Sequence, residues 1–368
     1  MIHFLAPRES APYVQDYIDR AKLGDQGNII GYEDIPHLDE FAPGLYVFTA
    51  INRLGPATVA MLTELHARLE DGTGLRPLNH PTKTLRRYEL LQALNREGLN
   101  EFKASGAWED LSDLRFPVFV RPREQDGTVP ELLHSHDAVR SAIGKELMDG
   151  WTLDELLVVE FKDTTDEHGV YRKYSAYIIG ERVLATSMDP GREWVMRRHS
   201  VDFRKDYLEE EWRYANENPH EEQLARIFSL SGTQFGRIDY SMSGDRVQTW
   251  EINTLPLLRR PPGVTPMPDE LRKTRQPTLD LVGRGYTGAF HHLLASVPSR
   301  TPFRPSLDEA TFRAAREELA SRGATDRRSG SERWAGLRRL VRPLKPVLKP
   351  LNSRTVLPLW ARWARRGR

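Results

Sequence analysis

Three oxygen-bearing side chains between residues 235 and 256 have the types and spacing to bind a divalent cation. Two β-rich runs flank Ser243-Gly244-Asp245, a pattern typical of an antiparallel hairpin. Glu251 and Asn253 are two residues apart, so they share one face of their strand. The turn places Asp239 within about one residue of lying opposite Glu251. Two carboxylates and an amide oxygen would then converge on one spot.

This cluster needs a positive charge, because carboxylates so close together repel each other. Oxygen ligands without His or Cys suit a hard cation, and Mg2+ commonly bridges protein carboxylates to phosphates. The alternative is an exposed acidic patch on a hairpin. A binding site is favoured because Asn253 stands at a strand end, just before Thr254-Leu255-Pro256.

The run from Arg237 to Pro256 resembles the final metal-binding hairpin of ATP-grasp enzymes, in which an Asp on one strand is followed by Glu-x-Asn on the next. The resemblance covers residues 79–298. It implies that ATP lies between two α+β lobes with two Mg2+ ions, or with Mn2+ in their place. It also implies that the metal ligands are Asp239, Glu251 and Asn253.

The resemblance extends to residues that would contact the nucleotide. Arg87 and Arg121 stand where such enzymes usually carry two phosphate-binding lysines. The positive charge is kept, but the compact ammonium group of lysine is replaced by the planar, forked guanidinium group of arginine. Glu160 matches the acceptor for the adenine amino group, with Phe161 and Lys162 beside the ring. The catalytic residues implied are Arg172, Lys173 and Arg237.

Two further features concern the phosphate loop and the substrate. The loop after Arg121 should be rich in glycine, so that backbone N–H groups can approach the phosphates. Residues 123–136 contain only Gly127, which departs from the family pattern. Arg259 and Arg260 follow the hairpin and would clamp a substrate carboxylate. An alternative of equal weight is that Arg259 and Arg260 are solvent-exposed loop residues without a ligand.

Composition excludes several chemistries. The 368 residues include no cysteine, which rules out disulfides, thiolate metal sites and cysteine nucleophiles. The apolar start, residues 1–6, lacks basic residues and is cut short by Arg8 and Glu9, so it predicts a strand and not a signal peptide. No apolar run approaches the roughly 20 residues of a membrane span. These features favour a cytoplasmic location.

The net charge of +1 hides a strong asymmetry. Residues 333–368 hold eleven Lys or Arg and no Asp or Glu, so residues 1–332 carry +1 − 11 = −10. A basic segment that also contains Trp334, Trp360 and Trp363 favours contact with an anionic membrane surface. Nucleic acid is the rival polyanion, and a disordered solubilising arm is the third interpretation.

Strand-like and helix-like runs alternate in the first 78 residues, which predicts a small α/β unit with a largely parallel sheet. We therefore expect an α+β protein with an ATP-grasp fold. The expected order is a pre-ATP-grasp α/β domain, an ATP-grasp domain of two lobes with antiparallel sheets, a helix with a linker, and a basic tail, at residues 1–78, 79–298, 299–332 and 333–368. A capping box of Ser306 and Glu309 would begin the helix.

The function implied by the resemblance is that of a Mg-ATP-dependent ligase. It would activate a small carboxylate as an acyl phosphate, which an amine, or less often a thiol, attacks. One alternative is a phosphotransferase that uses the same ATP site on a hydroxyl acceptor. The other is a non-catalytic ATP-binding module tethered to a membrane by its basic tail.

Overall fold

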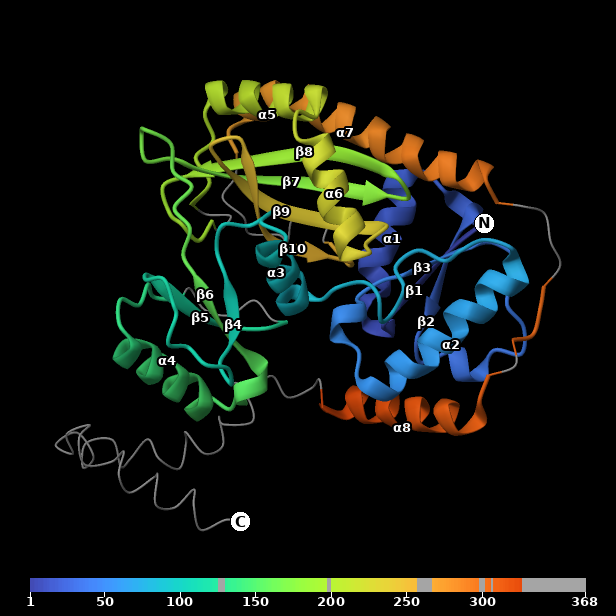
Figure 1. Cartoon of the computed structure of the whole chain (residues 1–368). Helices are drawn as coiled ribbons and strands as arrows, with labels where there is room; N and C mark the ends of the chain where they lie inside the picture. The colour runs from blue at the N-terminus through green and yellow to red at the C-terminus, as the bar shows by residue number, and fades with distance from the viewer. Residues whose placement is uncertain (125–129, 197–199, 257–266, 298–301, 306, 326–368) are drawn as a thin grey trace, which may run out of the picture.

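The computed structural model describes residues 1–124, 130–196, 200–256, 267–297, 302–305 and 307–325, which form three sheets with flanking helices (Figure 1). Among the helices in these ranges, none has both the length and the apolar character required to cross a membrane. The predictions for Arg259, Arg260, Ser306 and residues 333–368 concern positions outside the described residues.

The N-terminal unit contains a three-stranded parallel sheet in the order β2-β1-β3, as the alternating pattern predicts. Strands β1 and β3 are buried along their whole length, as is usual for parallel strands covered on both faces. The strands and helices of this unit are β1 (Ile2–Ala6), α1 (Ala11–Ala21), β2 (Gly27–Gly31), β3 (Leu45–Phe48) and α2 (Pro56–Thr73).

A first lobe is built on a small antiparallel sheet in the order β4-β6-β5. Helix α4 packs on it through Val139 and Ile143, and the Ser135 hydroxyl caps this helix by accepting from the backbone N–H of Ala138 at 3.2 Å. The elements of the lobe are β4 (Ala104–Gly106), β5 (Val118–Pro122), α4 (His136–Met148) and β6 (Leu156–Glu160).

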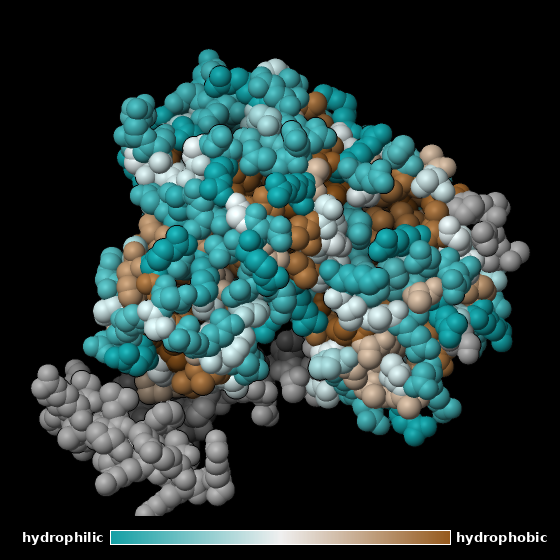
Figure 2. All heavy atoms as spheres, in the orientation of Figure 1, coloured by the Kyte–Doolittle hydropathy of each residue, from teal (hydrophilic) through white to brown (hydrophobic). Residues whose placement is uncertain are grey.

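A second lobe contains a four-stranded antiparallel sheet in the order β10-β9-β7-β8. Two-residue turns at Gly180 and Gly244, with φ of 67° and 61°, close the hairpin of β7 and β8 and the predicted hairpin of β9 and β10. Hydrophilic side chains cover most of the outer surface over α5 and α6, whose apolar sides face the sheet (Figure 2). The elements are β7 (Tyr171–Ile179), β8 (Arg182–Gly191), α5 (Lys205–Glu217), α6 (Glu221–Ser231), β9 (Phe235–Ser243) and β10 (Arg246–Asn253), with α3 (Arg87–Arg96) packed beside them.

Two C-terminal helices return to the N-terminal unit. Helix α7 (Asp269–Ala295) continues through Pro277 and packs on α1 and α5, and α8 (Glu309–Thr325) packs on α2. Near the start of α8 the carboxylate of Asp308 accepts from the backbone N–H of Thr311 at 2.8 Å. The expected arrangement of an α/β unit followed by two lobes with antiparallel sheets is confirmed.

Candidate functional site

The register of β9 and β10 brings the predicted metal ligands together. Asp239 lies directly opposite Glu251, and Arg237 lies opposite Asn253. A β-bulge between Thr249 and Glu251 sets this register. Because directly opposed residues of an antiparallel pair share a face, both carboxylates and the amide stand on the same side of the sheet.

Asp239 is the most enclosed of these ligands, with 3% of its surface exposed. Its carboxylate accepts hydrogen bonds from the hydroxyl of Ser175 at 3.0 Å and from Nε of Arg237 at 2.8 Å, and its Oδ2 lies 3.0 Å from Nζ of Lys173. Burial alone would raise its pKa, but Arg237 and Lys173 outweigh burial and hold the pKa well below its usual range. The same carboxylate raises the pKa values of both cations.

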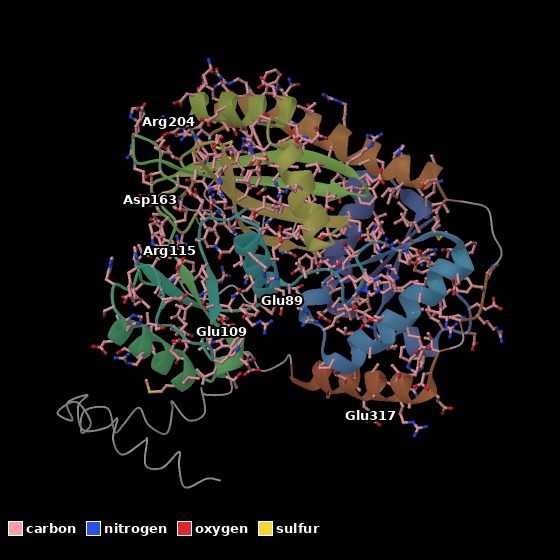
Figure 3. All side chains as sticks on the ribbon, viewed as in Figure 1. Glu89, Glu109, Arg115, Asp163, Arg204 and Glu317 are labelled. Carbon is pink, nitrogen blue, oxygen red and sulfur yellow. The ribbon has the colours of Figure 1, made fainter. Side chains whose placement is uncertain are left out.

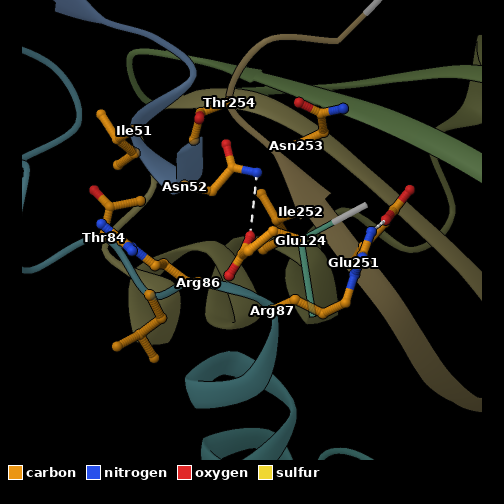
Figure 4. A pocket seen from close by; sticks show the side chains of 11 residues that line it. Ile51, Asn52, Thr84, Arg86, Arg87, Glu124, Glu251, Ile252, Asn253 and Thr254 are labelled. Atoms are coloured by element: carbon orange, nitrogen blue, oxygen red, sulfur yellow. Dashed lines mark hydrogen bonds and ion pairs between the residues drawn. The ribbon is translucent and has the colours of Figure 1, made fainter. Parts of the chain in front are cut away.

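Glu251 is paired with Arg87, the first residue of α3 (Figure 4). The other terminal nitrogen of Arg87 donates to the carbonyl of Arg123 at 2.8 Å, which fixes the guanidinium between the lobes. Burial opposes ionisation of Glu251, yet Arg87 and, more weakly, Arg121 lower its pKa overall. The two arginines predicted to bind phosphate therefore act on this carboxylate.

Asn253 stands at the end of β10, where its Oδ1 accepts from the backbone N–H of Leu255 at 2.8 Å. No group of three or more His, Cys, Asp or Glu side chains that could hold a metal occurs in the described ranges. The two carboxylates and the amide on one face of the hairpin would supply only a partial oxygen shell. Such a shell fits Mg2+ that is also bound by phosphate oxygens, better than it fits a cation in an all-protein cage.

The catalytic role expected of Arg172 is corrected by the structure. Adjacent strand residues point to opposite faces, and Lys173 takes the face that carries Asp239. The guanidinium of Arg172 lies on the other side, 2.6 Å from both Asp166 and Glu210. Arg172 therefore joins β7 to α5 and does not reach the carboxylate cluster.

The role expected of the Glu160 side chain is corrected as well. Its carboxylate is 3% exposed and accepts from the backbone N–H groups of Lys103 at 2.9 Å and Arg115 at 3.0 Å. The guanidinium of Arg115, a residue labelled in Figure 3, donates two hydrogen bonds to the same carboxylate, at 3.1 and 2.6 Å. The carboxylate is thus an anchor inside the first lobe and not an open acceptor for an adenine amino group.

An aromatic cluster lies beside the end of β6. The ring of Trp194, from the segment after β8, lies 5.1 Å from Phe119 and 5.5 Å from Phe161, measured between centroids. Lys162 forms an ion pair of 2.7 Å with Glu101. Phe161 and Lys162 therefore lie at the junction of the two lobes, and Trp194 is an additional aromatic group there.

The structure also contains a polar cavity of about 50 Å³ next to the hairpin (Figure 4). Its lining brings Asn52 of the N-terminal unit to Arg86, Glu124 and Thr254. Reasoning from the sequence missed these four residues. They come from four separate segments of the chain. Only Arg86 and Glu124, which lie close in sequence to the predicted phosphate-binding residues Arg87 and Arg121, could have been suspected from the sequence.

Comparisons with known proteins find similar solved structures, whereas no family model and no curated protein matches the chain. D-alanine–D-alanine ligase from Bacillus anthracis, complexed with ATP, is 12% identical, with 86% of this chain and 99% of that chain covered and a TM-score of 0.46. L-amino acid ligase from Bacillus licheniformis is 11% identical, with coverages of 69% and 68% and a TM-score of 0.42. The ATP-grasp ligase PsnB, complexed with a phosphomimetic variant of its minimal precursor, Mg and ADP, is 12% identical, with coverages of 77% and 97% and a TM-score of 0.44. Similarities at this level do not by themselves assign a function.

The charges around the hairpin do not balance. Two cations touch Asp239, one touches Glu251, and Arg121 acts on Glu251 electrostatically. Asp189 lies opposite Lys173 on β8 and acts on it electrostatically, so four positive groups face three carboxylates, which leaves 4 − 3 = +1 at the site. Such an excess attracts a polyanion, and the ionised carboxylates can hold the cations that accompany it.

Proposed function

We propose that the protein is an ATP-grasp ligase that uses Mg·ATP to activate a carboxylate as an acyl phosphate and to join it to an amine. The observation that carries this proposal is the convergence of Asp239, Glu251 and Asn253 with the surrounding cations on one face of the second-lobe sheet. ATP carries about four negative charges, so this excess of positive charge suits its phosphates.

Each group would have a distinct task. Asp239, Glu251 and Asn253 would hold two Mg2+ ions, which neutralise the charge that develops on the phosphates. Lys173 and Arg237 keep Asp239 ionised, and Arg87 and Arg121 would stabilise the transferring phosphoryl group. Because phosphoryl transfer depends on positioning and electrostatics, the site needs no nucleophilic side chain of its own.

The adenine and the substrate carboxylate would be bound by residues at the junction of the lobes and after the hairpin. Phe161 and Lys162, at the junction of the lobes, would line the adenine site together with Trp194. Arg259 and Arg260 would clamp the substrate carboxylate, as the resemblance implies. A small carboxylate and an amine are thus the proposed substrates.

The decisive experiment changes one metal ligand. Glu251→Gln should weaken Mg-dependent ATP binding about 100-fold, since even outer-shell changes cost 10–100-fold at metal sites. Binding would be measured by calorimetry at fixed Mg2+, and retained circular dichroism would show an intact fold. Glu181→Gln, in an exposed turn of the same lobe, is the matched control.

Products then distinguish the reactions. ADP formation that depends on pooled amino acids and small carboxylates, with an amide product, supports the ligase. A stable phosphorylated product would instead identify a phosphotransferase. Tight Mg·ATP binding without turnover on any pool would identify a binding module. Wild-type ATP affinity in the Glu251→Gln variant would refute the metal assignment.

A further inference from the structure

The polar cavity beside the metal-ligand hairpin is built by three parts of the molecule. Asn52 follows β3 of the N-terminal unit, Glu124 follows β5 of the first lobe, and Thr254 follows β10 of the second lobe (Figure 4). Its volume of about 50 Å³ admits a small polar head group but not a nucleotide. A ligand there would contact all three parts at once.

Glu124 is the unusual group in this cavity. Nδ2 of Asn52 donates to its Oε2 at 3.3 Å, whereas its Oε1 is buried without a hydrogen-bond partner among the described residues. Burial raises the pKa of Glu124, and the opposing effects of Asn52 and nearby arginines are smaller. A buried acceptor without a donor is unfavourable, so a ligand that donates hydrogen bonds would be stabilised here.

The neighbouring groups narrow the chemistry of that ligand. The terminal nitrogens of Arg87 are taken by Glu251 and the carbonyl of Arg123, while its Nε is buried without a partner among the described residues, and Arg86 donates to the carbonyl of Leu54 at 3.3 Å. Oγ1 of Thr254 is buried and has no partner within the described part of the chain. A carboxylate oxygen and a hydroxyl oxygen therefore await donors, and an ammonium group supplies three donors and a positive charge.

We infer that this cavity binds the ammonium end of the amine substrate, with Glu124 as the binding residue and Asn52 as its positioning residue. The inference rests on the proposed function. Glu124 takes one proton from the ammonium, and the nitrogen lone pair attacks the carbonyl carbon of the acyl phosphate. The new C–N bond replaces the C–O bond to phosphate. The attacking nitrogen gives its second proton to the departing phosphate, which leaves as inorganic phosphate, and Glu124 releases the first proton to solvent.

Adjacency to the hairpin supports this assignment. Glu251 and Asn253, two of the proposed metal ligands, also line the cavity. An amine held there lies beside the place where the phosphoryl group is transferred, so attack requires no long movement. Proximity of this kind is a main source of rate enhancement.

The test uses competition between two acceptors for one intermediate. The full chain is incubated with Mg·ATP, a pool of the twenty common L-amino acids and hydroxylamine, which is largely uncharged at neutral pH. Glu124→Gln should lower the ratio of amide to hydroxamate about 10- to 100-fold, the effect of losing one charged hydrogen bond. Glu131→Gln, exposed in the same connection, is the control. An unchanged ratio would overturn the inference.

A binding measurement separates this inference from the proposed function. If the parent protein forms neither hydroxamate nor amide, the ligase proposal fails and the cavity is judged by binding alone. Saturation-transfer NMR with ethylammonium should show binding to the parent and the Glu131→Gln protein, and loss of binding in Glu124→Gln. Acetate is the matched anionic probe. Equal ethylammonium binding by the parent and Glu124→Gln would refute the site.

Discussion

At the residue scale, three carboxylates within one region differ in how many cations accompany them. Asp239 touches Lys173 and Arg237, and Glu251 touches Arg87. Within the described residues the hydrogen bond to Glu124 comes from the amide of Asn52, and Arg87, Arg86 and Arg123 act on it electrostatically. The pKa is lowered for the first two and raised for the third. Their surroundings thus divide them into two ionised carboxylates, the proposed metal ligands, and a third carboxyl group whose protonated form is favoured.

The raised pKa of Glu124 predicts a specific dependence of stability on pH. Its folded pKa lies above the ordinary 4.5, so the folded state binds more protons than the unfolded state in that window. Stability therefore falls as the pH rises through the window, and the loss persists above it. Glu124→Gln should be more stable than the parent by about 1 kcal/mol at pH 7, and this difference should vanish below pH 4.5. Thermal unfolding across this pH range measures it, and a less stable variant at pH 7 would contradict the assignment.

Opposite faces of β7 predict opposite consequences for neighbouring substitutions. Lys173→Ala removes one of two cations from buried Asp239, so the affinity for Mg·ATP should fall about tenfold or more. Arg172→Ala breaks contacts with Asp166 and Glu210 on the far face, so the affinity should stay within about twofold. Calorimetric titration of both variants checks this, and equal losses would show that the faces are not functionally distinct.

The site could be predicted from the sequence where the determinants were local. A two-residue turn places Asp239 within one residue of Glu251, so their closeness follows from the hairpin. Counted from the turn alone, Asp239 would face Trp250, and the β-bulge between Thr249 and Glu251 that brings Glu251 opposite it had no signal in the sequence. The same alternation shows that Arg172 and Lys173 cannot both face the ligand. Asn52 and Glu124 could not be brought together from sequence, because their contact depends on how two separately folded parts pack.

At the element scale, one short connection joins the N-terminal unit to the second lobe. Asn79 is fully buried, with φ of 62°. Its Nδ2 donates to the carbonyls of Phe48 at 2.9 Å and Phe235 at 2.7 Å, and its Oδ1 accepts from the N–H groups of Gln234 and Phe235 at 2.9 and 3.0 Å. One side chain therefore ties β3 to the start of β9, the strand that carries Asp239.

Loss of this side chain should destabilise the whole chain. Asn79→Ala leaves four buried backbone groups without partners and places alanine at positive φ, so we expect a loss of about 3 kcal/mol. Asn79→Gly avoids the conformational strain and should be about 1 kcal/mol less damaging. Urea unfolding measures both, with Asn216→Ala on the exposed side of α5 as a control. If both variants lost the same free energy of unfolding, backbone strain at the positive φ of residue 79 would not contribute to the effect.

Other elements show where sequence patterns succeed and fail. Both hairpins of the second lobe follow from Gly-X turns, whose positive φ only glycine adopts easily. No sequence pattern gave the full extent of helix α7, because Pro277 and three glycines within residues 283–288 locally oppose a helix. Packing on α1 and α5 compensates for this weak propensity.

At the scale of the whole molecule, the N-terminal unit and the second lobe share one core. Phe4 and Tyr17 pack against Phe235 of β9 and Phe290 of α7, with ring centroids 5.4 to 6.0 Å apart. The hydroxyl of Tyr17 also donates to the carbonyl of Pro256 at 2.5 Å. The end of the metal-ligand hairpin therefore rests on the N-terminal unit, which explains how Asn52 reaches the cavity.

Truncations from the C-terminus should separate this framework from the basic tail. Glu318 of α8 accepts from the backbone N–H groups of Ala57 and Thr58 at 3.1 and 3.3 Å, where it stabilises the start of α2. A chain ending at residue 308 loses this contact together with buried Ala315 and Leu319, and should unfold at lower urea concentration.

A chain ending at residue 332 keeps α8 and should bind Mg·ATP as the parent does. It also loses eleven positive charges, leaving −10. Each Lys or Arg near an anionic membrane contributes about 1 kcal/mol, so the 332-residue chain should no longer sediment with phosphatidylserine vesicles. Neutral vesicles control for non-ionic adsorption. Unchanged sedimentation of the 332-residue chain would refute a membrane role for the basic tail.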